Sequence, residues 1–185
     1  ASCSKDDEVI NGGETAKGNA TLEVKMAVPQ TKSLGGDDSA TDDAISDLTV
    51  YVFENGTLQA VSGTTTGKGG SASRLISNLS AGTKKVLVLA NCTGKLDISP
   101  ALGTTTLAQL EAATGSITNE VNGSLSMNSQ VYEVTLTSNV TNYLGYKSTD
   151  IASGVNLNTQ VSLGDKPVYL YRNVAKITLN SVTLS

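Results

Sequence analysis

Hydrophobic and polar residues alternate one by one near the start of the chain, over residues 20–28. The apolar members of this alternation are Leu22, Val24, Met26 and Val28. Because successive side chains of a β-strand point to opposite faces, the pattern predicts a first strand with one buried face and one solvent-exposed face. Pro29 ends the pattern, since proline cannot donate a hydrogen bond to a neighbouring strand.

A β-hairpin is predicted in the next part of the chain. Apolar and β-branched residues dominate the segments 47–54 and 57–62, and Asn55-Gly56 stands between them. Both of these residues tolerate a positive φ, which the tightest hairpin turns require. The segment 83–91 is the most apolar stretch, so we expect it to be a central strand.

Shorter segments of the same character predict the remaining strands. They are residues 73–79, 125–127, 130–137, 142–146, 160–163 and the closing segment 167–184. One helix is expected over residues 106–114, where Thr106 can cap the first turn and Gly115 ends it. About seven to eight short strands with polar turns, and one short helix in a connecting loop, indicate an all-β antiparallel sandwich.

Composition supports a β-rich extracellular protein and argues against several other classes. Aromatic residues make up 4% of the 185 residues, and tryptophan is absent. The net charge of −4, with 13 scattered basic residues, argues against nucleic acid as a partner. With no histidine in the chain, a Ser-His-Asp triad is impossible. We therefore expect no enzyme activity, no metal site and no cofactor.

The two cysteines are expected to have different roles and not to form a disulfide. Cys92 follows the apolar segment 86–90, so we expect it to be a half-buried small apolar residue. Cys3 follows two small residues and precedes a polar, charged segment, as at the processed end of a bacterial lipoprotein. We expect lipidation of Cys3 and a tether over residues 1–17. The alternative is an ordinary N-terminal cysteine.

The order of several segments resembles that of the fimbrillins, the lipoprotein-derived subunits of type V fimbriae of anaerobic Gram-negative bacteria. The segments are 32–38, 48–53, 86–91, 125–128, 142–146 and 170–177. The resemblance implies two transthyretin-like β-sandwich domains. Residues 18–172 would be the N-terminal domain, and residues 173–185 would be the first strand of a C-terminal domain that the chain lacks.

The resemblance also implies how such a subunit matures. An acylated cysteine, carrying a group such as palmitate, brings the precursor to the outer membrane, and a trypsin-like protease then cuts the loop after the first strand. In this sequence Lys32 matches the cut position and Ser33 would become the new N-terminus. The best-known members have Arg there, which leaves the identity of the protease open. The alternative is a solvated lysine that is never cut.

Physical chemistry makes strand replacement reasonable for these residues. Loss of residues 20–28 would open an apolar groove, which is unfavourable by several kcal/mol until another strand with alternating side chains fills it, at about 1.5–3 kcal/mol per buried aliphatic side chain. We therefore expect a structural subunit of surface fimbriae that supports adhesion and biofilm formation, with copies of itself or related subunits as partners.

The sequence leaves two points open. An alternative function is that of a surface lipoprotein of the same fold that does not polymerise and acts as a fimbrial anchor or a glycan-binding module. In addition, Asp38-Ser39-Ala40 resembles an O-glycosylation pattern of such bacteria.

Overall fold

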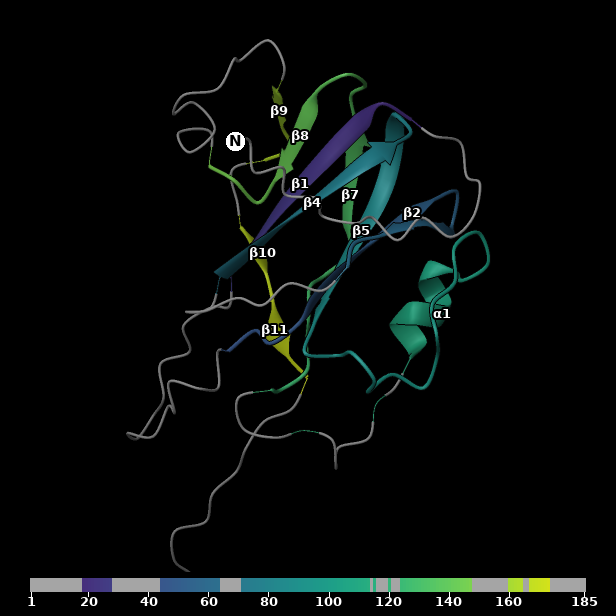
Figure 1. The fold of residues 1–185 in the computed structure, drawn as a ribbon, viewed down its shortest axis with the longest axis vertical. Coiled ribbons are helices and arrows are strands. Elements are labelled where there is room, and N and C mark those ends of the chain that lie inside the picture. Colours follow the sequence, from purple (N-terminus) through teal and green to yellow (C-terminus); the bar gives the residue numbers. More distant parts are fainter. Residues whose placement is uncertain are drawn as a thin grey trace, which may run out of the picture.

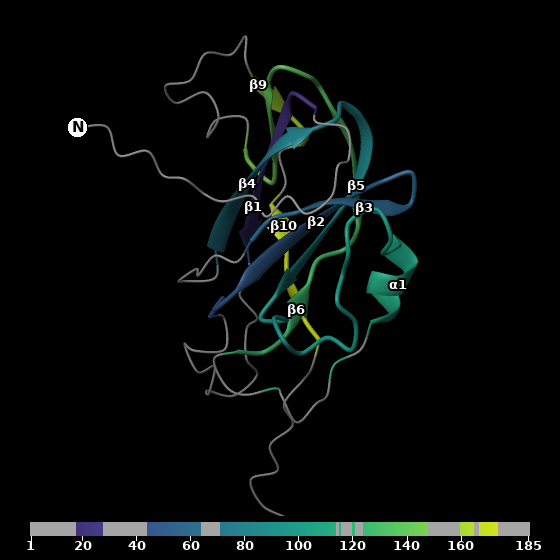
Figure 2. The same ribbon diagram turned by 45° about the vertical axis from the view of Figure 1, so that its right-hand side comes forward.

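Two β-sheets pack face to face in the computed structural model of this chain (Figures 1 and 2). The structure describes residues 18–27, 44–63, 71–113, 115, 120, 124–147, 160–164 and 167–173. Within these ranges the protein is a β-sandwich with one short helix, which confirms the all-β fold class predicted from the sequence.

The first sheet has β1 at its centre. Its strands are β1 (Ala20–Ala27), β4 (Ser71–Leu79), β8 (Thr141–Leu144), β9 (Gln160–Ser162) and β10 (Val168–Tyr169). β1 pairs with β4 in the antiparallel sense but with β8 and β10 in the parallel sense, and β8 pairs with β9 in parallel. The expectation of an entirely antiparallel sandwich is therefore corrected for this sheet. Side-chain alternation is the same in both kinds of pairing, so it could not reveal the direction.

The second sheet is antiparallel throughout its described pairs. Its strands are β2 (Leu48–Glu54), β3 (Thr57–Val61), β5 (Gly82–Ala90), β6 (Met127–Asn128), β7 (Tyr132–Leu136) and β11 (Tyr171–Arg172). β5 lies between β2 on one side and β6 with β7 on the other, as its apolar sequence predicted. The β2–β3 hairpin turns at Asn55 and Gly56, whose φ angles of 50° and 84° are both positive.

The helix α1 (Leu107–Ala112) covers the outer face of the second sheet (Figure 1). Thr106 caps it, because its hydroxyl accepts a hydrogen bond from the Gln109 backbone N–H while the Gln109 side chain accepts one from the Thr106 N–H. The helix stops at Ala112, before the expected end, since Ala113 already has an extended backbone conformation. Leu110 is buried against the sheet.

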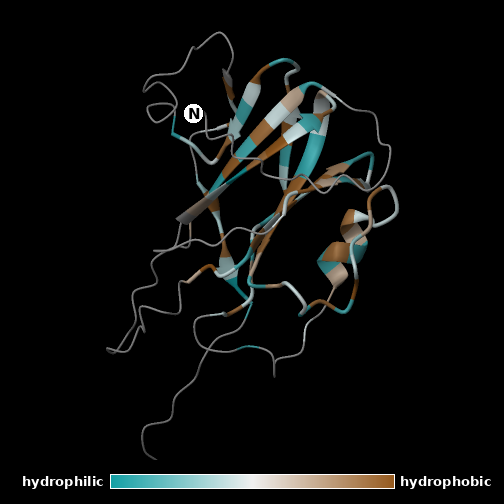
Figure 3. Ribbon diagram, in the orientation of Figure 1, coloured by the Kyte–Doolittle hydropathy of each residue, from teal (hydrophilic) through white to brown (hydrophobic). Residues whose placement is uncertain are grey.

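Two apolar clusters explain why the strands differ in their burial patterns. The main core lies between the sheets, and β1 contributes every second residue to it, so apolar and polar bands alternate along this strand (Figure 3). The second cluster lies between the outer face of the second sheet and α1 with the segment before it. β2 and residues 86–90 of β5 are covered on both faces, which is why these segments are apolar almost continuously.

The closing segment differs from the single long strand expected over residues 167–184. In its described part, β10 pairs with β1 in the first sheet and β11 pairs with β6 in the second. Leu170, fully buried between them, marks the point where the chain crosses from one sheet to the other. Two-residue strands such as β6, β10 and β11 also raise the number of described strands above the expected seven to eight. Residues 174–185 lie outside the described part of the chain.

Candidate functional site

The first strand is an internal strand of its sheet, with neighbours on both edges. On one edge β4 runs alongside it from the pair Ala20↔Leu79 to the pair Ala27↔Ser71. On the other edge β8 covers residues 21–24, and β10 covers Met26 and Ala27 (Figure 1). Loss of β1 would therefore separate the first sheet into three parts, β4, β10 and the pair of β8 with β9.

The inward face of β1 is completely buried. The side chains of Ala20, Leu22, Val24 and Met26 are each 0% exposed and belong to the core between the two sheets. Leu22, Val24 and Met26 are three of the four residues that the sequence suggested for an exchangeable first strand. The fourth, Val28, lies outside the described residues. The space that β1 occupies is thus an apolar groove in the core, filled by the chain's own residues.

Asparagine side chains hold the N-terminal end of β1 against β8 and the turn before it. The amide of Asn142, itself fully buried, donates to the Thr21 carbonyl at 3.0 Å and exchanges hydrogen bonds with the backbone of Thr137. One residue before β1, the Asn19 side chain donates to the Asn139 side chain at 2.7 Å, and the Asn139 N–H donates to the Asn19 carbonyl at 3.0 Å. These contacts fix the register in which the strand enters the sheet.

Gly145 allows the second half of β1 to pass close to the end of β8. It has a φ of +86°, and a Cβ atom built on it would lie 2.2 Å from the Lys25 carbonyl oxygen and 3.1 Å from the Val168 nitrogen. Any larger residue would push β1 away from the point where its partner changes from β8 to β10. The segment 142–146 is part of the family pattern in the sequence, but that pattern assigns no role to Gly145 or Asn142.

The outward face of β1 carries a polar cluster made by Glu23, Lys25, Tyr143 and Tyr146. The Tyr146 hydroxyl donates a hydrogen bond to the Glu23 carboxylate, and the Lys25 ammonium lies 5.4 Å from the centre of the Tyr146 ring. Tyr143 stacks edge-on against Tyr146, with 5.0 Å between the ring centres. Burial, followed by the hydrogen bond to Glu23, raises the pKa of Tyr146, so its hydroxyl is a neutral donor at ordinary pH.

The sequence profile of a known family matches this arrangement of strands over residues 20–165, which is well over half of the chain. The family is described as "Major fimbrial subunit protein (FimA)". The chain belongs to this family. Among curated proteins, no relative was found.

Solved structures agree with the family on the fold. A candidate cell adhesion protein from Parabacteroides distasonis is 23% identical with a TM-score of 0.57, covering 84% of this chain and 46% of its own. A second such protein from the same species is 23% identical with a TM-score of 0.54, covering 83% and 40%. A fimbrilin from Porphyromonas gingivalis is 20% identical with a TM-score of 0.53, covering 85% and 41%. The chain thus spans less than half the length of each of these structures.

Membership in the FimA family carries some general properties. It is a family of structural fimbrial subunits and not a family of enzymes, and a fimbrial family implies a place at the cell surface. Within the described residues, no helix is long and apolar enough to cross a membrane. The same residues contain no group of three potential side-chain ligands that could hold a metal ion.

Three residues of the proposed maturation pathway lie outside the described part of this fimbrial subunit. They are Cys3, the expected lipidation site, and Lys32 with Ser33, the expected cleavage site. The tether over residues 1–17 and the Asp38-Ser39-Ala40 pattern also lie outside it. These assignments remain predictions from the sequence.

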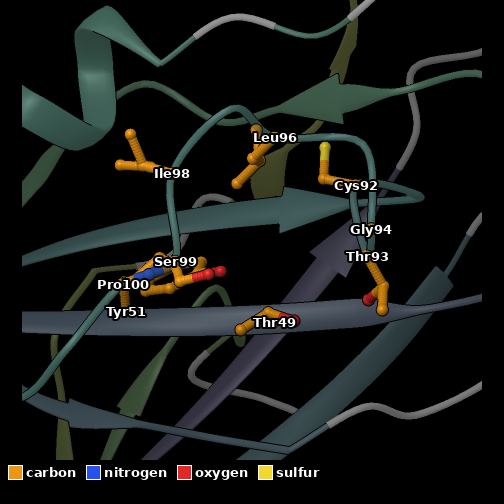
Figure 4. Close-up of a pocket in the computed structure, with 9 residues that line it drawn as sticks. All are labelled: Thr49, Tyr51, Cys92, Thr93, Gly94, Leu96, Ile98, Ser99 and Pro100. Carbon is orange, nitrogen blue, oxygen red and sulfur yellow. The ribbon is translucent and has the colours of Figure 1, made fainter.

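A second concave site lies on the outer face of the second sheet. This pocket has a volume of about 300 Å³, and Figure 4 shows it between β2, which contributes Thr49 and Tyr51, and the segment 92–100. Cys92 lines it and is buried and unpaired, its thiol donating to the Ala90 carbonyl at 3.2 Å. Cys92 was expected to be only half-buried, and the covering segment 92–100 explains the difference.

The titratable groups of this pocket are held in their neutral forms. Burial raises the pKa of the Cys92 thiol above its ordinary value, so little of it is thiolate at neutral pH. Burial, reinforced by Cys92, raises the pKa of Tyr51 to about 12. Neither group is therefore suited to act as a nucleophile or a base in this environment.

Two buried polar clusters stabilise the second sheet, and the pattern of hydrophobic residues in the sequence predicts neither of them. Lys84 has no exposed side-chain surface and forms a 2.6 Å ion pair with Glu54. Asn91, also fully buried, joins the segments before β2 and β6. Its oxygen accepts from the Ser46 N–H and hydroxyl at 2.8 and 2.9 Å, and its amide donates to the Ala44 and Leu125 carbonyls at 2.8 and 2.9 Å. Lys84 lies near the start of β5 and Asn91 directly follows its last residue. Both are polar, so a hydrophobic pattern cannot assign them to a core.

Proposed function

We propose that this member of the FimA family is a polymerising fimbrial subunit in which a strand from a neighbouring subunit replaces β1. The observation that carries the proposal is the position of β1 in the middle of the first sheet, with a fully buried inward face. A strand at this position cannot leave unless another strand of the same alternation takes its place.

The energetics fit a subunit that is stable before maturation and reactive after it. Leu22, Val24 and Met26 are fully buried, and burial of each side chain contributes about 1.5–3 kcal/mol. Their removal therefore costs about 5–9 kcal/mol of burial free energy. That is comparable with the total stability of a typical domain, about 5–15 kcal/mol. An emptied subunit is therefore strongly driven to accept a new strand.

The maturation steps in this proposal follow the order of residues along the chain. Acylation of Cys3 brings the precursor to the outer membrane on the tether of residues 1–17. A trypsin-like protease then cuts after Lys32, in the segment that follows β1. Residues up to Lys32 are released, Ser33 becomes the new N-terminus, and the fimbriae that form support adhesion and biofilm formation.

N-terminal sequencing of the protein recovered from cell-surface filaments tests this function. The proposal predicts a chain that begins at Ser33, and a Lys32→Ala variant that stays at full length in the outer-membrane fraction. A Lys17→Ala variant, which changes a lysine of the tether, is the matched control and should mature normally. Full-length chains that keep Cys3 and remain on the membrane would instead support the second function, a surface lipoprotein that anchors fimbriae or binds glycans.

A further inference from the structure

We propose that the outward face of the β1 position is a recognition surface, which selects an incoming strand with an acidic side chain in place of Glu23 and a long basic one in place of Lys25. This inference rests on the proposed function and specifies the partner of the same site. The occupant is a strand of a second subunit. The buried face of the groove favours apolar residues in the incoming strand, and the outward face favours charged residues at two positions.

The chemistry of Tyr146 supports an acidic residue in the incoming strand. Its hydroxyl points at β1 and donates to the Glu23 carboxylate. The side chains of Tyr143 and Tyr146 are half-buried and packed against each other, so Tyr146 is positioned in part by residues outside β1. A strand with an apolar residue at this position would take the carboxylate acceptor away from this partly desolvated hydroxyl and leave it the neutral Ser73 hydroxyl as a partner, which is less favourable.

The same ring supports a basic residue two positions further on. The Lys25 ammonium lies 5.4 Å from the Tyr146 ring centre, within the range of a cation–π contact. Residues 23 and 25 point to the same face because side chains alternate along the strand. One tyrosine therefore contacts two successive outward positions, with opposite requirements for charge.

Backbone contacts determine which residues of an incoming strand meet Tyr146. β1 pairs with β8 through Glu23↔Tyr143, and Gly145 leaves no room between its own backbone and the Lys25 carbonyl. A shift by one residue would place the charged side chains in the core and the apolar ones in water. The backbone register and the two charged side chains thus specify the same alignment of the incoming strand. A strand with the apolar residues but without the charges would match the inward face of the groove and not the outward face.

A peptide-uptake experiment tests the recognition surface. The full chain is cut after Lys32, and fluorescent peptides spanning residues 18–32 compete with its own first strand, followed by fluorescence anisotropy. The peptides carry the natural sequence, Glu23→Gln, Lys25→Met, or the matched control Thr21→Ser on the same outward face. The changes are in the peptide, so the folding of the protein is unaffected.

We expect Glu23→Gln to weaken uptake about two- to fivefold, because the glutamine oxygen can still accept from the Tyr146 hydroxyl but lacks the charge that strengthens the bond. We expect Lys25→Met to weaken uptake about two- to fivefold through loss of the cation–π contact. Thr21→Ser should stay within about twofold of the natural peptide. In protein carrying Tyr146→Phe, the natural and Glu23→Gln peptides should bind equally, whereas Tyr143→Phe should keep their difference. This coupling is the result expected for two side chains in direct contact, and the Tyr143→Phe protein separates it from a general effect of changing the tyrosine pair.

The possible outcomes separate the two proposals. Equal uptake of all four peptides, or a Glu23→Gln effect that persists in the Tyr146→Phe protein, would overturn the recognition surface while leaving strand replacement in place. Failure of every peptide to enter the cut protein would overturn strand replacement itself, and the recognition surface with it.

Discussion

Shortening Leu22 to alanine tests whether β1 is part of the cooperative core of the uncut protein. Leu22 is fully buried between the two sheets and pairs with Ile76 on β4 and Asn142 on β8. Leu→Ala substitutions at such sites lower the free energy of unfolding by about 2–5 kcal/mol, because burial is lost and a cavity remains. Thr21→Ala, one residue earlier on the outward face, is the control and should change it by less than about 0.5 kcal/mol.

Urea denaturation followed by circular dichroism provides the measurement. With a typical denaturant slope of about 2–3 kcal/mol per molar urea, a loss of about 3 kcal/mol moves the midpoint down by about 1 M. A midpoint for Leu22→Ala equal to that of Thr21→Ala would refute the reasoning. It would mean that the groove is closed by other residues and that β1 contributes nothing to the stability of the precursor.

Three further predictions concern the surroundings of β1 and the second sheet. Gly145→Ala should lower the thermal midpoint more than Gly56→Ala, because both have a φ near +85° but only the first places a Cβ against the β1 backbone, so equal shifts would contradict the close approach. Asn91→Ala should lower the free energy of unfolding by about 3 kcal/mol or more in a denaturant titration, since several buried groups lose their partners, and a change below about 1 kcal/mol would count against the cluster. The hydrogen bond from Lys84 lowers the pKa of Glu54 from 4.5 in the folded protein. The stability that this pair contributes is therefore fully present above about pH 4.5 and is lost as the pH falls through the lowered pKa of Glu54. Glu54→Gln should therefore flatten the acid side of the curve of thermal midpoint against pH, and an unchanged acid slope would show that other groups cause it.

Local patterns in the sequence were sufficient to predict most strands and the helix. Alternation predicted β1, because one of its faces meets the core and the other meets solvent. The Asn55-Gly56 turn and the Thr106 cap were predicted because their backbone requirements restrict the residue types that fit. In each case the decisive interaction lies within a few residues along the chain.

Features that depend on contacts between distant segments could not be predicted from those patterns. The parallel pairing of β1 with β8 joins segments more than a hundred residues apart, and the crossing of the chain at Leu170 depends on which sheet edge is free. The same holds for the site. The apolar residues of β1 were evident in the sequence, but the roles of Tyr146 and Gly145 exist only once β1 lies beside them.

A reversible covalent lock on β1 tests the central claim most directly. Glu23 and Leu75 are opposite each other on β1 and β4, so Glu23→Cys with Leu75→Cys can form a cross-strand disulfide, in a background where Cys3 is changed to serine. Precursor cut by the maturation protease is examined for filaments by electron microscopy, with and without a reducing agent. We predict no filaments from the oxidised variant, and filaments from the same sample after reduction. Filaments that form equally well with the disulfide closed would contradict the claim that β1 must leave.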